Sequence, residues 1–318
     1  MPDTCTLLVM HDIYINQLKT LILDQAKGQG FLPSSLPDVL LMRMNQYLPL
    51  APTVYEPCIL IVAQGRKIGV LGGNRYVYDA QHCLVLTIPL PLASETFGSP
   101  EEPFLAIAVK VTQSIVTELL VQMDGAPPDV EAEEGMPEVL VDNEILAAAV
   151  RLAETLRSPE RARVLGPNIV RELIYLLLQG PGRTALSSLA AGHDNRWRIG
   201  RVVQRLQKEY LARVDVPTLA REAGMSTSSF HARFKAVTGA TPLHYQKLIR
   251  LHKARDLMVN AGLTAQTAAV EVGYESATQF SREFRRLFGD SPRVVSGQLR
   301  ARLSELQQPH LPMTLSFS

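Results

Sequence analysis

Two segments of this chain carry the same short pattern at a spacing of 50 residues. The first, SSFHARFKAVTGATP, covers residues 228–242, and the second, TQFSREFRRLFGDSP, covers residues 278–292. The identical positions are Ser226 and Ser276, Phe230 and Phe280, Phe234 and Phe284, Gly239 and Gly289, and Pro242 and Pro292. This match predicts two copies of one small structural unit in the C-terminal part of the chain.

Each identical pair suits one step of a helix-turn-helix unit. The serines stand where an N-cap belongs, and the phenylalanines, four residues apart, share one helix face that points into a core. The glycines suit a C-terminal stop, and the prolines suit the first turn of the next helix. Upstream, LAREAGMS and AAVEVGYES each supply an alanine and, four residues on, a turn glycine. The sequence therefore predicts helix-turn-helix units at about residues 215–238 and 264–288.

The positions that differ between the two copies lie opposite the phenylalanines. A helix turns by about 100° per residue, which puts these positions on the outward faces of the two helices. They are Ser228, Ser229, His231, Ala232 and Lys235 in the first helix, and Thr278, Gln279, Ser281, Arg282 and Arg285 in the second. A constant core face with a variable outward face is what two readers of different DNA half-sites require, because side chains read base edges.

A single helix is predicted between the two units. PLHYQKLIRLHKARDLMVN, residues 242–260, patterns as one helix of roughly 27 Å. Two reading helices held about one DNA turn apart, roughly 34 Å, can enter successive major grooves on one face of the duplex. One chain would then read two sites.

The charge distribution agrees with a DNA-binding C-terminal part. The 318 residues suit two domains and carry a net charge of only +1. Residues 1–195 hold 13 Lys and Arg against 22 Asp and Glu, whereas residues 196–318 hold 19 against 9. Only the second part suits a polyanion such as double-stranded DNA.

The chain has no apolar run of the roughly 18 residues that a membrane span needs, and its start lacks a leader pattern. Its 3 cysteines form no disulfide framework or zinc pattern. These features predict a cytoplasmic protein that does not associate with membranes.

In the N-terminal part, the spacing of apolar residues changes along the chain. Helical patterns cover residues 7–27, 112–123, 143–157 and 167–179, and short β-type runs fill residues 40–111, with a hairpin turn at residues 72–74. An antiparallel sandwich and a small barrel both fit these runs. The acidic segment 124–138 is predicted as a solvated loop, residues 180–192 as a linker, and the end of the chain as a loose tail.

Over about residues 196–300, the chain resembles the AraC/XylS family of bacterial transcription regulators. The resemblance rests on both helix-turn-helix units, the connecting helix and the run VGYESATQFSREFRRLFGDSP. The family pattern usually ends in Pro-x-x-Tyr-Arg, whereas this chain has Pro292-Arg293-Val294-Val295, so the closing contact is expected to differ.

The resemblance implies roles for individual side chains. The positions matching the family's base-reading residues are Ser228, His231, Ala232, Thr278, Gln279 and Arg282. Phosphate contacts are expected from Ser226, Lys235, Ser276, Arg285 and Arg286. Ala232 can offer only a methyl contact, and Arg282 is the residue best suited to a guanine.

Residues 35–190 resemble the cupin-like N-terminal domain of one AraC subgroup, through VYEPCILIVAQGRKIGVLGG, YVYDAQHCLVLTIPLPLAS and SPEEPFLAIAV. That likeness implies an α+β chain with a sensing or dimerisation domain at residues 1–192, in which a barrel at about 35–115 precedes helices at about 116–180. A DNA-binding domain at 193–305 and a tail at 306–318 follow. Self-association is expected through the helix at 139–157 or the run 169–178, with core packing as the alternative.

An enzymatic cupin is the alternative for the β-rich part. A reactive metal needs two or three histidines and a carboxylate, but residues 35–115 contain only His82, so no metal, cofactor or catalysis is expected. The candidates for contact with a small effector are Arg66, His82 and Cys83. Cys83 would act as a sensing thiol or, in the simpler interpretation, as an inert core residue, and Arg66, beside Lys67, would bind an anion or lie in a solvated turn.

These observations together predict a sequence-specific regulator that binds a promoter or operator, recruits or blocks RNA polymerase, and acts as a homodimer with a possible small-molecule effector. The alternative is a sensor or interaction protein that binds DNA with little sequence preference.

Overall fold

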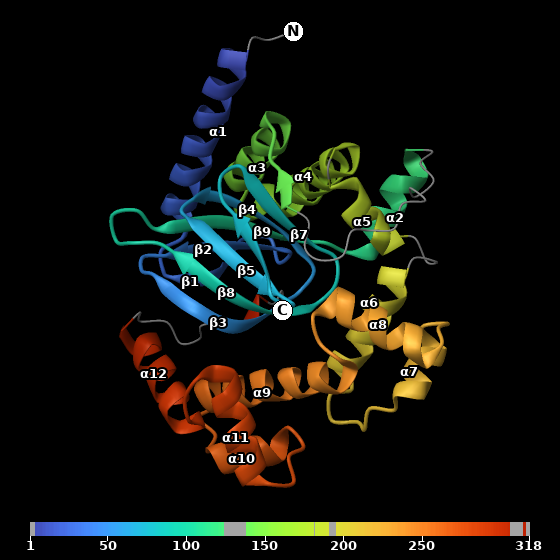
Figure 1. Cartoon of the computed structure of the whole chain (residues 1–318). Coiled ribbons are helices and arrows are strands. Elements are labelled where there is room, and N and C mark those ends of the chain that lie inside the picture. The colour runs from blue at the N-terminus through green and yellow to red at the C-terminus, as the bar shows by residue number, and fades with distance from the viewer. Residues whose placement is uncertain (1–3, 124–137, 181, 191–194, 306–313, 316–318) are drawn as a thin grey trace.

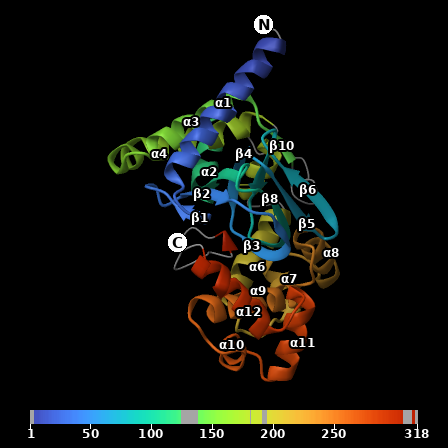
Figure 2. The same cartoon turned by 90° about the vertical axis from the view of Figure 1, so that its left-hand side faces the viewer.

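The structure is a computed structural model, and it describes residues 4–123, 138–180, 182–190, 195–305 and 314–315. An N-terminal part of two β-sheets and five helices is followed by an all-helical C-terminal part, which packs against one end of the sheets (Figure 1). Turned by 90°, the same arrangement places α1 (Thr4–Gln25), α3 (Asn143–Thr155) and α4 (Pro159–Gln179) at the end of the molecule away from the C-terminal helices (Figure 2). The predicted α+β class is confirmed.

The strands form two sheets. The first has the order β1 (Gly30–Pro33), β2 (Val39–Met44), β9 (Phe104–Lys110), β4 (Cys58–Gln64), β7 (His82–Leu86) and β10 (Glu138–Leu140). The second has the order β11 (Thr314–Leu315), β3 (Leu48–Tyr55), β8 (Leu90–Phe97), β5 (Arg66–Leu71) and β6 (Asn74–Tyr78). Neighbouring strands are antiparallel, except that β11 runs parallel to β3.

The predicted small barrel is corrected to a pair of sheets, because no pairing among the described strands joins the two into a closed cylinder. The central strand β4 is buried on both faces. Ile59 and Ile61 pack into the core beneath α1 and α3, whereas Leu60 and Val62 pack into the core on the other face. A strand buried on both faces is a continuous apolar run, and such a run does not reveal whether its sheet closes.

The helices of the N-terminal part lie close to their predicted positions, with three corrections. The helix expected at 139–157 begins at Asn143, because the residues before it include β10. The predicted helix at 167–179 begins earlier, at Pro159, where Ser158 accepts a hydrogen bond from the amide of Arg161 as an N-cap. The predicted linker contains a further helix, α5 (Arg183–Ala190), which packs on α2 (Gln113–Gln122). Most of the acidic segment, residues 124–137, lies outside the described residues.

The C-terminal part consists of helices α6 to α12, of which α9 is the long connecting helix. Their bounds are α6 (Asn195–Lys208), α7 (Val216–Glu222), α8 (Thr227–Thr238), α9 (Pro242–Asn260), α10 (Ala265–Glu271), α11 (Ala277–Phe288) and α12 (Pro292–Glu305). In the predicted tail, Thr314 and Leu315 pair with β3 and the other residues beyond Glu305 lie outside the described part. No helix in the described part is both long enough and apolar enough to cross a membrane.

The two helix-turn-helix units are built on different hydrophobic cores. Phe230 and Phe234 of α8 belong to a core that also contains sheet residues such as Leu86. Phe280 and Phe284 of α11 belong to a separate, smaller core, whose buried members come from α9, from α10 and its C-cap, and from α11. On the side of the first unit, hydrophobic packing therefore continues from the sheets into the C-terminal helices.

Polar contacts tie α9 to the sheets. The Tyr245 hydroxyl donates a hydrogen bond to the carbonyl of Pro89 at 3.2 Å, and both groups are buried. The guanidinium of Arg255, which is only 2% exposed, donates to the carbonyl of Pro52 at 3.0 Å. Because buried polar groups are costly when unpaired, these bonds favour one position of α9 against β3 and β8.

Gly239 and Gly289 offer a matched test of the contact between α8 and the sheets. Both end their helices in the left-handed region, at φ of 72° and 86°, and a Cβ on Gly239 would lie 2.8 Å from the amide nitrogen of Gly72. Around Gly289 there is open space. We expect Gly289→Ala to lower the free energy of unfolding by about 1 kcal/mol and Gly239→Ala to lower it further, as measured by urea unfolding. Equal losses would contradict the close approach.

Candidate DNA-binding surface

The two helix-turn-helix units share the local geometry that their common sequence positions predict. Ser226 accepts a hydrogen bond from the amide of Ser229 at 3.3 Å, and Ser276 accepts one from the amide of Gln279 at 3.2 Å. Both serines are therefore N-caps, as predicted. The phenylalanine rings in each unit are buried and lie 5.4 Å apart in α8 and 5.5 Å apart in α11.

The turns that precede α8 and α11 are also alike. Gly224 and Gly273 have positive φ values of 64° and 79°, a backbone conformation that residues with a Cβ rarely adopt. Each glycine follows a short first helix, α7 or α10, and precedes the capped second helix. The sequence prediction of two helix-turn-helix units is thus confirmed at the level of the backbone.

All side chains predicted to read bases or phosphates lie on exposed positions of the two units. The exposed base-reading candidates are Ser228, His231, Ala232, Thr278, Gln279 and Arg282, and the exposed phosphate candidates are Ser226, Lys235, Ser276, Arg285 and Arg286. Each of these residues is exposed to solvent, and their individual roles remain predictions.

The two candidate reading helices have different surroundings. Ala232 and Lys235 of α8 line a hollow of about 350 Å³ together with the β5–β6 turn, at Gly72 and Asn74. On α11, the side-chain amide of Gln279 donates a hydrogen bond from Nε2 to the carboxylate of Glu283 at 3.1 Å. This bond uses one of the two N–H donors of the Gln279 side-chain amide and leaves the other donor and the carbonyl oxygen available.

Glu283 is a positioning residue that sequence analysis missed. Its carboxylate also accepts hydrogen bonds from Lys247 of α9 and from the Tyr274 hydroxyl, both at 2.8 Å. Partial burial raises the pKa of Glu283, but the hydrogen bonds from Lys247, Gln279 and Tyr274 outweigh burial and lower the pKa below its usual value. The spacing of Gln279 and Glu283, four residues apart on one helix, was the available signal.

The connecting helix has the bounds that the sequence predicts, Pro242–Asn260, with 19 residues. Thr241 caps it by accepting from the amide of His244. At the end of the second unit, Val295 packs against the core of α9, α10 and α11. Val295 thereby occupies the region of the closing contact for which the chain departs from the family pattern.

The three effector candidates do not lie together, because they belong to two different sheets. Arg66 begins β5 and stacks on the ring of Phe97 at 4.2 Å, while His82 and Cys83 lie on β7 of the other sheet. His82 contacts Asp79 through Nδ1 at 3.1 Å. The neighbouring Lys67 was expected either to bind an anion with Arg66 or to lie in a solvated turn. It is buried, and its ammonium donates a hydrogen bond to Thr96 at 2.7 Å.

Cys83 has the properties of a core residue. Its side chain is fully buried, and burial raises the pKa of its thiol to about 12. Because the thiolate is the reactive form, we expect Cys83 to be labelled by a disulfide reagent far more slowly than free cysteine at pH 7, with the rate rising only as the pH approaches that value or the chain unfolds. Labelling as fast as free cysteine at neutral pH would contradict the burial.

The described residues contain no cluster of three or more His, Cys, Asp or Glu side chains that could hold a metal ion. Two solvent-exposed, capped helices on a basic C-terminal part remain the most prominent site. This arrangement defines a class of protein, the DNA-binding regulators with paired helix-turn-helix units.

Comparison with known proteins identifies the family. Residues 35–185 match the model of the AraC-type transcriptional regulator N-terminus, and residues 219–298 match a helix-turn-helix domain model. The chain belongs to the AraC family and is a sequence-specific DNA-binding transcription regulator.

Curated relatives support this assignment. The chain is 26% identical over 255 residues to the HTH-type transcriptional activator RhaS of Yersinia pseudotuberculosis, which covers 76% of this chain and 86% of RhaS. It is 28% identical over 148 residues to the HTH-type transcriptional regulator ExsA of Pseudomonas aeruginosa, covering 46% of this chain and 53% of ExsA.

A solved structure shares the two-part fold. The crystal structure of wild-type ToxT from Vibrio cholerae, with a bound unsaturated fatty acid, aligns with a TM-score of 0.55 at 12% identity. The alignment covers 83% of this chain and 95% of that chain. This likeness shows the fold.

Proposed function

We propose that the chain binds its operator with α8 and α11 in successive major grooves on one face of the duplex. Base contacts are assigned to Ser228, His231, Ala232, Thr278, Gln279 and Arg282, and phosphate contacts to Ser226, Lys235, Ser276, Arg285 and Arg286. The observation that carries this proposal is the pairing of exposed, variable helix faces on two capped units that one helix of 19 residues joins.

We further propose that the bound protein recruits or blocks RNA polymerase in the bacterial cytoplasm, where the chromosome lies. The matched relatives RhaS, an activator, and ExsA, a regulator, support a role at promoters. A homodimer is part of the proposal. Most apolar side chains of the two segments expected to self-associate, residues 139–157 and 169–178, are buried in the core, as the alternative had it. The support for a dimer is instead the exposed apolar surface of α4, where Val164 and Leu165 are 61% and 43% exposed.

Control by a small effector that binds the N-terminal part is also proposed. The ToxT structure, which contains a fatty acid, supports effector control in a protein of the same fold. The proposal includes no enzymatic activity, since the matched relatives are regulators of transcription. The alternative function is a sensor whose basic C-terminal part binds DNA with little sequence preference.

Selection of bound sequences from a random duplex library, at physiological salt with the full chain, separates these functions. Specific reading by both helices is expected to enrich a motif with two blocks about 10 base pairs apart. A motif with one block would remove one helix from the proposal. Retention without any enriched motif would favour the alternative.

A further inference from the structure

The β5–β6 hairpin of the N-terminal part lies against the first candidate reading helix. A Cβ on Gly239, the C-cap of α8, would lie only 2.8 Å from the amide nitrogen of Gly72 in the hairpin turn. Leu71 of β5 also belongs to the hydrophobic core that contains Phe230 of α8. The hairpin is therefore in direct contact with this helix.

The hairpin borders the second half of α8 on its outward side. Ala232 and Lys235 line one side of the hollow of about 350 Å³, and Asn74 and Tyr76 of β6 line the other. Ala232 and Lys235 are exposed, and the proposed function turns them toward the duplex. A DNA strand beside this half of α8 would therefore lie next to the hairpin as well.

The hairpin also lies on the same side of the molecule as both candidate reading helices. In Figure 2, strands β5 and β6 and helices α8 and α11 all lie along the right-hand side of the view. A duplex that contacts α8 and α11 on that side has the hairpin on the same side.

The hairpin carries positive charge within an acidic part of the chain. Residues 66–78 contain 3 Lys and Arg and no Asp or Glu, whereas residues 1–195 as a whole hold 13 Lys and Arg against 22 Asp and Glu. Two of these basic residues, Arg66 and Arg75, are exposed. Because Arg75 pairs with Val70 and side chains two residues apart share a face, both arginines lie on one face of the hairpin. This face suits a polyanion.

The side chain of Arg75 is accessible to a phosphate group. It is 59% exposed, and its guanidinium lies 3.5 Å from the carboxylate of Glu95. Exposed ion pairs of this kind are weak, because both charges are well hydrated and both side chains lose freedom. The guanidinium has further N–H donors from which a phosphate oxygen can accept hydrogen bonds.

The dimensions of the major groove place the hairpin at its edge. A helix with its side chains is about 10–12 Å across and the major groove is about 12 Å wide, so a helix in the groove fills it. An element packed against the side of such a helix lies beside the sugar-phosphate backbone that borders the groove. Asn74 and Arg75, the first residues of β6, are exposed at this position.

We propose that the β5–β6 hairpin is a third DNA contact, in which Asn74 and Arg75 donate hydrogen bonds to backbone phosphates beside the groove that α8 enters. The inference rests on the proposed function, since it requires α8 to lie in a major groove. The N-terminal part then binds the operator directly, and it adds affinity without adding base preference, because phosphates carry no sequence information.

The salt dependence of operator affinity tests this contact in the full chain. The operator is the sequence enriched by selection, and affinity is measured by fluorescence anisotropy between about 50 and 200 mM salt. Arg75→Gln is expected to weaken binding about 5- to 10-fold at about 0.1 M salt and to reduce the slope of log affinity against log salt by about one, because one phosphate contact is lost. The base preference at every position should stay the same.

Arg157→Gln is the matched control. The Arg157 side chain is also 59% exposed and forms an ion pair, with Asp24 at 3.9 Å. It follows α3, at the end of the molecule away from the C-terminal helices (Figure 2). This variant removes the same charge from a similar ion pair and should change neither the affinity nor the slope. Arg75→Lys keeps the charge and should retain the wild-type slope.

Hydroxyl-radical footprinting locates the contact on the operator. The wild-type chain is expected to protect backbone sugars beside the block that α8 reads, and Arg75→Gln is expected to lose that protection and to keep the protection at the α11 block. An unchanged slope and footprint in Arg75→Gln would overturn the third contact, as would an equal loss in Arg75→Lys. A gain of affinity in Arg75→Gln would also overturn it and would show that the hairpin obstructs the duplex.

Lys235→Ala separates this inference from the proposed function. If Lys235→Ala reduces the salt slope and Arg75→Gln does not, the hairpin contact alone is wrong. If neither variant changes the slope and selection enriches no operator, the proposed function is wrong and the hairpin contact fails with it.

Discussion

Replacing Phe284 with alanine is expected to lower the free energy of unfolding of the second helix-turn-helix unit by about 3–5 kcal/mol. The Phe284 ring is fully buried and contacts two other rings, with centroids 5.5 Å from Phe280 and 4.4 Å from Phe288. The core around it is small, so the neighbouring side chains have little apolar surface with which to refill the cavity. Hydrogen exchange of α10 and α11 amides, followed with urea unfolding, measures the loss.

The same variant is expected to abolish protection of one half-site in a footprint and to leave the other. The separation of the two cores is the reason, because Phe284 shares no core with α8. Ser281→Ala, at an exposed position of the same helix, is the matched control and should change stability by less than about 0.5 kcal/mol. Simultaneous loss of both half-sites would show that the units unfold together and would contradict the division of the cores.

Arg282→Ala is expected to weaken binding to the selected operator by about 1–3 kcal/mol and to relax the preference at one base position. The guanidinium lies on an exposed position of α11, opposite the buried phenylalanines, where it can form two hydrogen bonds with a guanine edge. Titration of the variant against operators that differ at each position in turn measures both effects. A uniform loss across all operators would remove Arg282 from the base-reading set.

Lys235→Ala is the comparison for Arg282→Ala. Lys235 is exposed on α8 and is assigned to phosphate, so its loss should weaken all duplexes alike and reduce the slope of log affinity against log salt by about one. The two variants lie on different units, and each should leave the base preference of the other unit intact. A relaxed base preference in Lys235→Ala would move this side chain from phosphate contact to base reading.

The features that the sequence predicts correctly are local ones. Each of these features depends on a few neighbouring residues: the serine cap, the two phenylalanines one turn apart and the left-handed glycine. The bounds of α9 follow from Thr241, Pro242 and the period of the apolar residues. These signals can be interpreted because the same pattern occurs twice in the sequence, at a spacing of 50 residues. The positions of the candidate reading side chains follow directly from the helix period.

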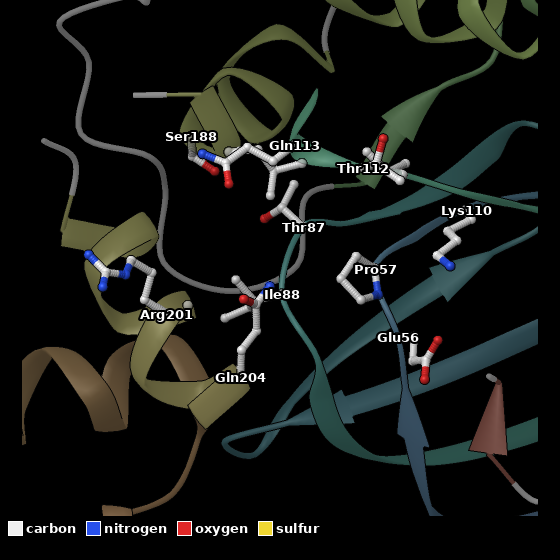
Figure 3. A pocket seen from close by; sticks show the side chains of 13 residues that line it. Glu56, Pro57, Thr87, Ile88, Lys110, Thr112, Gln113, Ser188, Arg201 and Gln204 are labelled. Atoms are coloured by element: carbon white, nitrogen blue, oxygen red, sulfur yellow. The ribbon is translucent and has the colours of Figure 1, made fainter. Parts of the chain in front are cut away.

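The features that sequence analysis missed depend on residues far apart. Strands β4 and β9 are buried on both faces of their sheet. Because such strands are continuous apolar runs, their sequences do not indicate which strands pair with them. The α5 segment has turn-like flanks, and its helix is stabilised by packing on α2. A pocket of about 310 Å³ (Figure 3) draws its residues from the end of β9, from the segments just before β4 and just after β7, and from α2, α5 and α6, so no short motif could have indicated it.

The unequal cores give the two reading units different local stabilities. A unit whose buried face is shared with a sheet can open only when that sheet contact breaks, so its opening free energy approaches that of the N-terminal part. The unit around Phe284 has its own core, although α11 also contacts β3, and we expect it to open at a lower cost. If α11 binds one half-site as proposed, that half-site would be released and bound again many times while α8 stays in place. The protein would then dissociate from its operator in two steps. The rate of the first step would determine how quickly a competing protein can bind the half-site that is released.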